Sequence, residues 1–360
     1  MYSTRNTIAI VIPSLNPEEF LLDYLHLLQN QGFLEIIVVN DGSTKGTEIF
    51  DKIQEEKLCR VITHEVNQGK GQALKTGFAY LLNQYNREEL TGVVTADADG
   101  QHSLEDTIRV ADKLAESHSF ILGCRDFDQE MVPIKSKFGN KLTTWIFAVL
   151  YGKRISDTQT GLRGIPYSFL AECVAMKGQR FDYEIRMLIQ GVTEGIGVEE
   201  VPIETIYYHG NRETHFRAVK DSLRIYRILF SQWFLFLSSS LISFVVDIVL
   251  FWLLIKFLPG RLPERERILV GTLGARIVSS FFNYFMNGNL VFKKVKPGAK
   301  RKTRESLVRY YLLCIFQANL SWILVAWVVS GLSGSETFVK VVVDTLLFLI
   351  SYQIQRRWVF

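Results

Sequence analysis

Two aspartates separated by one residue form the most chemically suggestive pattern in the sequence. Asp97 and Asp99 follow the apolar run Gly92–Thr95, and Gln101 adds an amide oxygen two residues later. Two carboxylates on a turn can bind a hard divalent cation such as Mg2+ or Mn2+, which can also bridge a diphosphate. A solvated acidic turn explains most D-x-D patterns. The D-x-D pattern in this chain nevertheless follows an apolar run, which leads us to expect a metal site formed by Asp97, Asp99 and Gln101.

Polar residues also follow two earlier apolar runs. Asn16 comes shortly after Ile8–Ile12, and Asp41 comes directly after Glu35–Asn40. We expect a further strand at Val61–His64 and helices from about Glu18 to Asn30 and over Gly71–Asn83. Apolar runs that alternate with helices are typical of a parallel sheet covered on both faces, in which ligands bind beyond the carboxyl ends of the strands. The sequence therefore predicts an α/β fold with one crevice that collects Asn16, Asp41 and Asp97.

The segment Asn67–Gly71 places two glycines before the second of these helices. Glycines at a helix start let the backbone approach a phosphate or a ribose. The segment is no Walker loop, because the spacing and the final Lys-Ser/Thr pair are absent. Taken alone, it is more simply interpreted as a turn with a helix cap.

The second half of the chain is dominated by four apolar segments: Trp233–Leu258, Ile268–Phe292, Tyr310–Leu332 and Phe338–Phe360. Each exceeds the ~20 residues that cross a hydrocarbon layer of ~30 Å, so we expect transmembrane helices and not the buried helices of a soluble bundle. The connection Lys293–Arg304 carries seven Lys or Arg and no acid. Basic connections stay cytosolic, which places the first half of the chain in the cytosol as well. The connection Pro259–Arg267 would then lie outside the cytosol, and its three Arg against two Glu conflict mildly with this tendency.

Composition excludes several classes of protein. The 360 residues are 48% hydrophobic and contain four widely spaced cysteines, which excludes a disordered chain and a disulfide scaffold. The net charge of +4 is too small to indicate nucleic-acid binding. The first residues lack the apolar core of a signal peptide, in agreement with a cytosolic first half.

Five motifs occur together in a fixed order in the first half: Ile-Pro-Ser-Leu-Asn-Pro-Glu at 12–18, Val-Asn-Asp-Gly-Ser at 39–43, Asn-Gln-Gly-Lys-Gly at 67–71, Asp-Ala-Asp-Gly-Gln-His at 97–102 and Asp-Thr-Gln-Thr-Gly-Leu-Arg at 157–163. In this order they resemble the family-2 glycosyltransferases, on the branch of dolichol-phosphate mannose synthase and bactoprenol glucosyltransferase, over about Thr7–Arg227. The second half resembles the GtrA-like four-span family.

The resemblance implies a GT-A fold, a nucleotide-sugar donor and a polyprenyl phosphate acceptor. It assigns the metal that holds the donor diphosphate to Asp97, Asp99 and Gln101. Position by position, it further implies that the donor is bound by Pro13, Leu15, Glu18, Asp41, Lys75, Asp97, Arg212 and His215. Leu15 stands where the family usually has an aromatic residue.

The resemblance also assigns Arg125 to the acceptor phosphate. A second family arginine lies just before Ser136, where Lys135 or Lys137 supplies a point charge in place of a fork. The acceptor needs no strong base, because a phosphate with a second pKa of ~6 is mostly dianionic at neutral pH. Alignment and charge neutralisation then carry the reaction. We expect catalytic roles for Asp99, Arg125 and Asp157, the last orienting the sugar or the acceptor. A turn or helix cap is the alternative for Asp157.

Two segments mix basic and apolar residues. They cover about 135–153 and about 216–230, and basic amphipathic helices of this kind lie in the membrane interface. A solvated helix packed on the catalytic core is the alternative. We expect a cytosolic catalytic domain over residues 1–230 and a transmembrane domain over 231–360.

Polar residues inside the apolar segments are Asp247, Arg276, Asn283, Asn287 and Asp344. They serve either lipid binding and translocation or hydrogen bonding between helices. The segments also contain a weak repeat, since Phe282–Phe292 resembles Ile350–Phe360. Two copies of a hairpin, or chance similarity, would explain it.

These observations lead to one expected function. Together with the resemblance, they lead us to expect a metal-dependent inverting glycosyltransferase that transfers a hexose from a nucleotide sugar to polyprenyl phosphate at the cytosolic membrane face, in a bacterial plasma membrane. A UDP-sugar is the first choice of donor and GDP-mannose the second, and the transmembrane domain is a possible site of homo-oligomer formation. The alternatives are a lipid-linked sugar transporter with an attached transferase and a processive polysaccharide synthase. The synthase motif Gln-x-x-Arg-Trp has only a superficial match at Gln355–Trp358, at the end of a span.

Overall fold

The computed structural model describes residues 4–128, 134–204, 218–257, 263–292, 303–331 and 336–360. The chain divides into two compact units, Met1–Leu229 and Phe230–Phe360. The boundary falls beside Phe230, where the apolar second half of the sequence begins. Each unit is described separately below.

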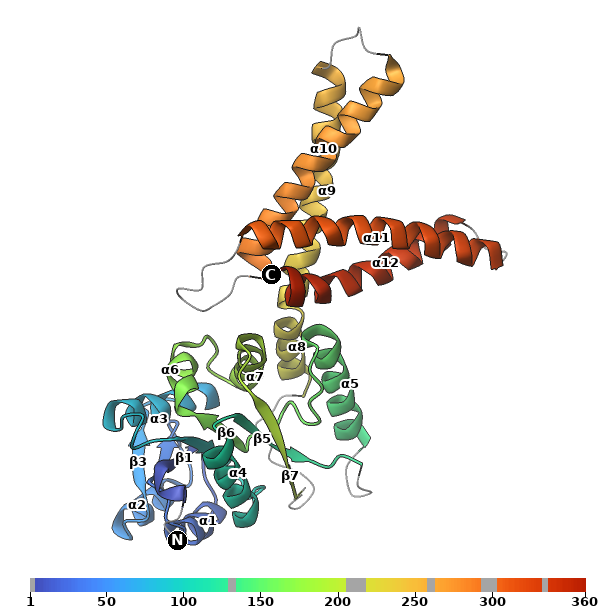
Figure 1. The fold of residues 1–360 in the computed structure, drawn as a ribbon. Coiled ribbons are helices and arrows are strands. Elements are labelled where there is room, and N and C mark those ends of the chain that lie inside the picture. The colour runs from blue at the N-terminus through green and yellow to red at the C-terminus, as the bar shows by residue number, and fades with distance from the viewer. Residues whose placement is uncertain (1–3, 129–133, 205–217, 258–262, 293–302, 332–335) are drawn as a thin grey trace. The chain divides into compact units, whose positions relative to one another are not determined.

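A seven-stranded sheet forms the centre of the first unit (Figure 1), with the strand order β3-β2-β1-β4-β6-β5-β7. The strands are β1 Ile8–Ser14, β2 Glu35–Asn40, β3 Arg60–Thr63, β4 Gly92–Thr95, β5 Phe120–Arg125, β6 Arg163–Pro166 and β7 Val198–Ile203. Only β6 is antiparallel to its neighbours. The carboxyl ends of the other six strands therefore lie along one edge of the sheet. The expected α/β fold with a mainly parallel sheet is confirmed.

Helices cover both faces of this sheet, which explains why its central strands are apolar throughout. Every residue of β1 is buried. Ile10 packs in one cluster with side chains of α1, α2 and α4, whereas Val11 faces α3, where Gly77 leaves room for it. The helices of the unit are α1 Phe20–Gln29, α2 Thr47–Glu55, α3 Lys70–Gln84, α4 Leu104–Ser117, α5 Ile134–Tyr151, α6 Tyr167–Ala175, α7 Asp182–Glu194 and α8 Ala218–Leu229.

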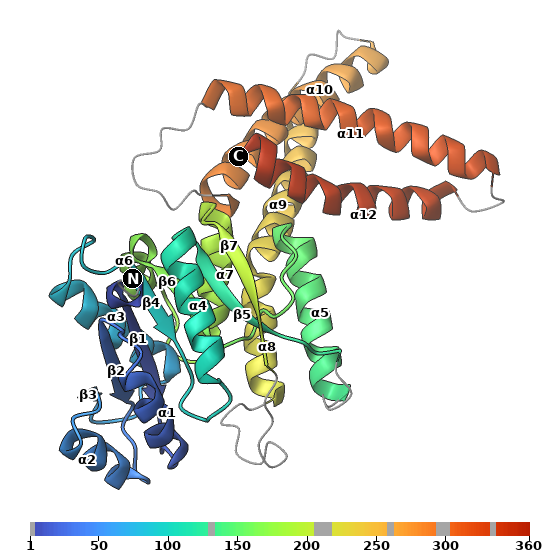
Figure 2. The ribbon, with the colours of Figure 1, turned by 60° about the horizontal axis from the view of Figure 1, so that its bottom comes forward.

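Within its described residues, the second unit contains four helices that are long and apolar enough to cross a membrane. They are α9 Ser231–Phe257, α10 Glu264–Met286, α11 Thr303–Gly331 and α12 Glu336–Ile354. The four expected apolar helices are confirmed, although α10 and α11 begin several residues earlier than the apolar runs do. Figures 1 and 2 show α10 beside α9 and α12 beside α11, so the unit consists of two helical hairpins.

Both hairpins end in a five-residue π-helical segment. The first is Asn287–Val291 and the second is Gln355–Val359. Asn287 and Gln355 begin these segments, and the Asn287 side-chain amide donates a hydrogen bond to Gln355 Oε1 at 3.0 Å. The two segments that resemble each other in sequence therefore share an unusual backbone and meet at equivalent residues.

Aromatic rings connect the two hairpin ends reciprocally. Tyr284 of the first hairpin lies 5.5 Å from Phe360 of the second, and Phe292 of the first lies 5.6 Å from Tyr352 of the second, measured between ring centroids. Tyr284 corresponds to Tyr352, and Phe292 to Phe360, in the sequence repeat. Such an exchange is typical of two copies related by an approximate two-fold axis, and it favours a genuine repeat over chance similarity.

The acidic residues of the spans hydrogen-bond to neighbouring helices. Asp247 on α9 accepts a hydrogen bond from Ser279 Oγ on α10 at 2.7 Å, and Arg276 lies 3.7 Å away. Asp344 on α12 accepts one from Ser321 Oγ on α11. Each hairpin is thus joined internally by a serine and an aspartate, which supports the role of hydrogen bonding between helices.

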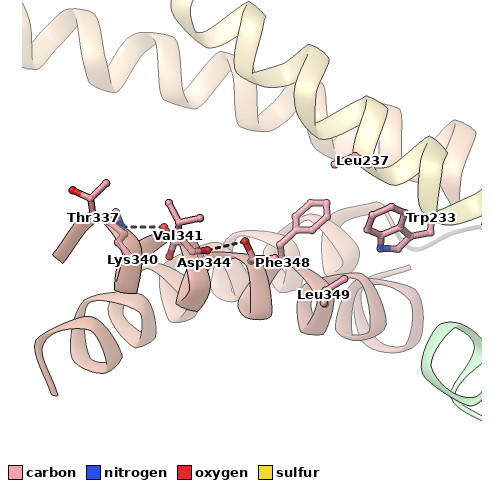
Figure 3. Close-up of a pocket in the computed structure, with 9 residues that line it drawn as sticks. Trp233, Leu237, Thr337, Lys340, Val341, Asp344, Phe348 and Leu349 are labelled. Carbon is pink, nitrogen blue, oxygen red and sulfur yellow. Dashed lines mark hydrogen bonds and ion pairs between the residues drawn. The ribbon is translucent and has the colours of Figure 1, made fainter. Parts of the chain in front are cut away.

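An open groove of about 570 Å³ runs along one face of α12 (Figure 3), and nine residues line it: Trp233, Leu237, Thr337, Lys340, Val341, Asp344, Thr345, Phe348 and Leu349. Its residues on α12 recur every three to four positions, and α9 contributes Trp233 and Leu237. Lys340 Nζ lies 3.0 Å from the Asp344 carboxylate. The groove is therefore apolar, with one ion pair in its wall.

Candidate active site

Asp41 holds the loop that starts α3. The residue follows β2 and is buried. One carboxylate oxygen accepts a hydrogen bond from Gln68 N at 2.9 Å and the other from Gly69 N at 2.7 Å, while His64 Nδ1 lies 2.8 Å away. Gly69 has a φ of 100°, which favours glycine, and an added Cβ would collide with Gln179 O. In the structure Asp41 therefore positions the glycine loop; its expected contact with the donor stays a prediction.

Lys70, the first residue of α3, reaches two carboxylates from distant parts of the chain. Its Nζ lies 2.6 Å from Asp97 Oδ1 and 3.0 Å from Glu184 Oε1. Asp97 belongs to the loop after β4, and Glu184 lies on α7. One ammonium thus joins the glycine loop, the aspartate loop and a helix on the same side of the sheet.

The two aspartates of the D-x-D turn have different protonation tendencies. Burial alone would raise the pKa of Asp97, but the Lys70 ammonium and His102 outweigh it, so this pKa lies far below its usual range. Partial desolvation and the negative charge of Asp97 raise the pKa of Asp99. Burial would lower the pKa of Lys70, but Asp97 and Glu184 together raise it. Asp97 and Lys70 are therefore a fully charged pair at neutral pH.

The loop of residues 157–163 packs directly against Asp97. Gly161 O accepts a hydrogen bond from Thr95 Oγ1 at 2.8 Å, and an added Cβ on Gly161 would collide with the Asp97 carboxylate. The fully buried Arg163 donates hydrogen bonds to Glu184 O at 2.6 Å and to Thr160 O at 2.8 Å. Arg163 therefore fixes this loop to α7 beside the Lys70 carboxylates.

Arg125 ends β5, on the same edge of the sheet, and forms an ion pair with Asp157. Arg125 Nε lies 2.7 Å from one carboxylate oxygen and Nη2 lies 3.3 Å from the other. Asp157 is fully buried, whereas a quarter of the Arg125 side chain is exposed. The pair therefore places a partly exposed guanidinium at the edge that also holds Asp97.

Comparison with known proteins shows the family of both units. The first matches the model "Glycosyl transferase family 2" over residues 9–183, and the second matches "GtrA/DPMS, transmembrane domain" over residues 266–360. A UDP-N-acetylglucosamine–dolichyl-phosphate N-acetylglucosaminyltransferase of Methanococcus voltae is 30% identical over 56% of this chain and 86% of its own length. The chain belongs to glycosyl transferase family 2.

Two further relatives of this family-2 glycosyltransferase cover the same part of the chain. A dolichyl-phosphate β-glucosyltransferase of Saccharomyces cerevisiae is 28% identical over 54% of this chain and 66% of its own. A polyprenol monophosphomannose synthase of Mycolicibacterium smegmatis is 26% identical over 56% of this chain and 77% of its own length. With its GtrA/DPMS domain and four apolar helices, this glycosyltransferase is an integral membrane protein.

The expected metal ligands supply oxygen donors only. Asp99 Oδ1 accepts a hydrogen bond from Gln101 N at 3.1 Å, which keeps these two residues together beside Asp97. Across the described ranges, no group of three or more His, Cys, Asp and Glu side chains is arranged to hold a metal ion. Two carboxylates with an amide oxygen still suit Mg2+ or Mn2+, which bind oxygen and complete their shell with water and phosphate. The residues of the D-x-D turn therefore fit the expected metal, with Lys70 as a competing partner of Asp97.

The remaining donor residues expected in this glycosyltransferase are distributed unevenly. Pro13 is buried within β1, Leu15 is half-buried just beyond it, and Glu18 is exposed. Lys75 lies on α3 and donates to Gly178 O at 2.7 Å, with the Tyr183 ring 5.1 Å from its ammonium. Arg212 and His215 lie outside the described residues.

The acceptor residues are only partly described. Two lysines of α5 form ion pairs with Asp128 Oδ1: Lys137 Nζ lies 2.8 Å from it and Lys141 Nζ lies 2.6 Å from it. Together they lower the pKa of Asp128 to about 2. Lys135 and Ser136 fall in the first turn of α5, where the description of the structure does not extend to side chains. The acceptor roles of Lys135, Ser136 and Lys137 stay predictions, as does that of Arg125.

Sequence reasoning missed Glu184, His64 and the structural role of Arg163. Arg163 ends the motif at 157–163, yet nothing in the sequence shows that it is buried. Glu184 precedes Ile185, Met187 and Leu188 by one, three and four positions on α7, so a single charge on an apolar helix face is the one signal that could have pointed to it. His64 is expected at the end of a strand, but the sequence does not reveal its partner Asp41.

Proposed function

We propose that this family-2 glycosyltransferase transfers a hexose from a nucleotide sugar to polyprenyl phosphate with inversion, using Mg2+ or Mn2+. One observation carries the proposal. The 157–163 loop joins two charged sites at one edge of the sheet: it packs on Asp97, and its first residue holds Arg125. A diphosphate site and a phosphate-binding arginine next to each other are what phosphate attack on a nucleotide sugar requires.

The donor side consists of the glycine loop and the D-x-D turn. Asp97, Asp99 and Gln101 would hold the cation, which neutralises the charge of the departing nucleoside diphosphate when it is bound. Asp41 fixes the loop beneath, and Lys70 adds a positive charge at the same place. The names of the three relatives specify a UDP-sugar, a glucosyl group and a mannosyl group. A UDP-sugar is therefore our first choice of donor and GDP-mannose our second.

The acceptor side consists of Arg125 and Asp157. Asp157 accepts hydrogen bonds from Nε and Nη2 of the guanidinium and so fixes its direction, and the quarter of the Arg125 side chain that is exposed lies within reach of an incoming anion. A phosphate dianion bound there needs no general base, because its oxygen already carries the charge with which it attacks. Direct attack on the anomeric carbon, opposite the departing diphosphate, gives one inversion. Arg125 therefore aligns the nucleophile without taking its proton.

One helix of the catalytic unit exposes an apolar stripe. On α5 the exposed side chains Phe138, Leu142, Trp145 and Val149 follow one another at spacings of four, three and four residues, which places them on one face. Phe147 and Leu150 of the same helix are buried. An exposed row of this size beside Lys141 suits the membrane interface, where an apolar face inserts and lysines meet anionic headgroups. Leu223 on α8 is similarly exposed, next to Arg224 and Arg227.

We place the catalytic unit on the cytosolic side of a bacterial plasma membrane, where nucleotide sugars are made. The basic connection Lys293–Arg304 supports this orientation. The acceptor lipid would then reach Arg125 from the membrane surface on which α5 lies. The helices of the second unit are the natural surface for homo-oligomer formation, because most of their side chains face outward.

The deciding experiment is an assay of the purified protein with undecaprenyl phosphate and radiolabelled UDP-glucose, UDP-N-acetylglucosamine or GDP-mannose. The proposal expects organic-extractable label that requires both the lipid phosphate and Mg2+ or Mn2+, with one sugar per lipid and an inverted anomeric centre. Full activity in EDTA would refute the metal requirement. Label in a polymer that organic solvent does not extract would indicate a processive synthase. Transbilayer movement of a lipid-linked sugar without transfer would indicate a transporter.

A further inference from the structure

The ammonium of Lys70 is shared between two carboxylates, and this sharing has a consequence for metal binding. Nζ lies 2.6 Å from Asp97 Oδ1 and 3.0 Å from Glu184 Oε1, and less than a fifth of the Lys70 side chain is exposed. Lys70 is also anchored at its backbone, because Asp41 fixes the preceding Gly69. Its ammonium is therefore a fixed charge of the site and not a mobile surface group.

Asp97 is the carboxylate that both Lys70 and a divalent cation would use. Two positive charges on one carboxylate repel each other, and this repulsion is strong where side chains are mostly shielded from water. A cation that arrives alone therefore meets a carboxylate whose charge is already balanced. Asp99 and the neutral side chain of Gln101 are then the remaining ligands of the turn.

A diphosphate changes this balance. It brings two or more negative charges next to the D-x-D turn, so that Lys70 acquires a third anionic partner besides Asp97 and Glu184, and Asp97 becomes available to the cation. Glu184 makes the exchange easier, because it stays bound to Lys70 while the ammonium leaves Asp97. The four-carbon stem of lysine allows such a short movement without a change in the backbone.

We propose that Lys70 makes the cation site depend on the donor: it competes with a lone divalent cation for Asp97, and the diphosphate of the donor relieves this competition. The inference rests on the proposed function, since it assumes a nucleoside diphosphate donor. Lys70 acts through Asp97 and is therefore a positioning residue. The site would then take up cation and nucleotide together and not hold the cation beforehand.

The test measures Mn2+ affinity without any turnover. Free Mn2+ is followed by electron paramagnetic resonance in titrations of the full chain in detergent, with and without saturating UDP. In the unaltered protein we expect UDP to tighten Mn2+ binding at least about tenfold. Lys70→Gln should bind Mn2+ alone at least about tenfold more tightly than the unaltered protein does, and the effect of UDP should shrink accordingly.

Two controls separate charge from structure. Lys70→Arg keeps the positive charge and should keep the weak binding of Mn2+ alone. Lys113→Gln removes another lysine–carboxylate pair, to Glu199 at 3.1 Å on the surface, and should change neither titration. Lys70→Met offers a second neutral side chain of similar length if Lys70→Gln does not fold, and circular dichroism verifies the fold of each variant.

The outcomes are distinct. Unchanged or weaker binding of Mn2+ alone in a folded neutral variant would overturn the role of Lys70. That role would equally be overturned if neither UDP nor GDP tightened Mn2+ binding in the unaltered protein, or if the nucleoside without phosphate did so equally well. The proposed donor class fails separately, and the inference with it, if the unaltered protein with Mn2+ binds neither UDP nor GDP in equilibrium dialysis.

Discussion

Arg125 and Asp157 face each other in a two-pronged ion pair, with Nε at 2.7 Å from one carboxylate oxygen and Nη2 at 3.3 Å from the other. Asp157 has no exposed surface, and its carboxylate also accepts a hydrogen bond from Gln159 N at 3.0 Å. The two residues, one expected at the acceptor and one expected to orient the reactants, thus form a single unit. Substituting either one alone changes both charge and stability.

Arg125→Ala should lower kcat/KM for the lipid phosphate at least about tenfold, since a charge-assisted contact contributes about 1.5–3 kcal/mol. It should also lower the free energy of unfolding by about 3 kcal/mol, because Asp157 keeps a buried charge without its partner. Steady-state kinetics and thermal unfolding measure the two effects. The double variant Arg125→Ala with Asp157→Asn should regain stability and stay inactive. A loss of donor binding with unchanged acceptor kinetics would contradict the assignment of Arg125.

Asp99→Ala should abolish transfer while leaving the fold intact. Asp99 is exposed and accepts a hydrogen bond from the nearby Gln101 N, so its removal should cost less than about 1 kcal/mol of stability. The same variant removes an anionic ligand from the expected metal. Activity assays with Mn2+ in excess, together with melting temperatures, test the prediction. Retained transfer at ordinary metal concentrations would argue against Asp99 as a ligand.

Gly161→Ala should inactivate the enzyme through Asp97. A Cβ at this position would collide with the Asp97 carboxylate, which cannot withdraw far on its single methylene. The matched control is Gly139→Ala on α5, where a Cβ meets no atom within 4 Å. That change should keep full activity and add about 0.5–1 kcal/mol of stability, because alanine is the better helix former. Equal activity of the two variants would show that Asp97 tolerates displacement.

Trp145→Glu should reduce transfer to long-chain polyprenyl phosphate in membranes by several-fold. The side chain is 65% exposed in the centre of the α5 stripe, so a charge there opposes insertion into the interface without disturbing the core. Transfer to a short, water-soluble prenyl phosphate should be unchanged. Leu27→Glu is the control, because Leu27 is 52% exposed on α1, outside the stripe. If both variants lost the same activity, the stripe would have no special role.

The three connections between the apolar helices should lie on defined sides of the bilayer. Single cysteines are placed in Lys293–Arg304, Pro259–Arg267 and Ser330–Glu336 after removal of Cys59, Cys124, Cys173 and Cys314. Only the second and third connections should react with an impermeant thiol reagent in intact cells. Labelling of Lys293–Arg304 would overturn the cytosolic placement.

If the placement holds, a chain ending at Phe230 should keep some activity on a short prenyl phosphate, and complete inactivity of such a folded chain would assign part of the acceptor site to the spans.

The parts of the fold that can be predicted are those whose pattern is local. The sequence locates four parallel strands within one or two residues, because each is an unbroken apolar run that a polar residue terminates. It does not reveal β5, β6 and β7. The apolar run of β5 is interrupted by Gly123. In β7 only the first and last residues are buried, and two glutamates and a proline lie between them. β6 has only four residues, the first of which is Arg163. These strands are recognisable only from the neighbours with which they pair.

Sequence alone determined the family, the α/β class, the four apolar helices and the strand-end position of Asp41 and Asp97, because all of these follow from composition, periodicity and motif order. The tertiary structure decided the partnerships. Each of these partnerships joins segments that lie from 21 to 114 residues apart in the chain: Lys70 with Asp97 and Glu184, Arg125 with Asp157, and Arg163 with the α7 backbone. No local pattern encodes such pairs. Buried charges must find counter-ions or hydrogen bonds wherever the fold brings them, and only the folded chain specifies which ones lie within reach.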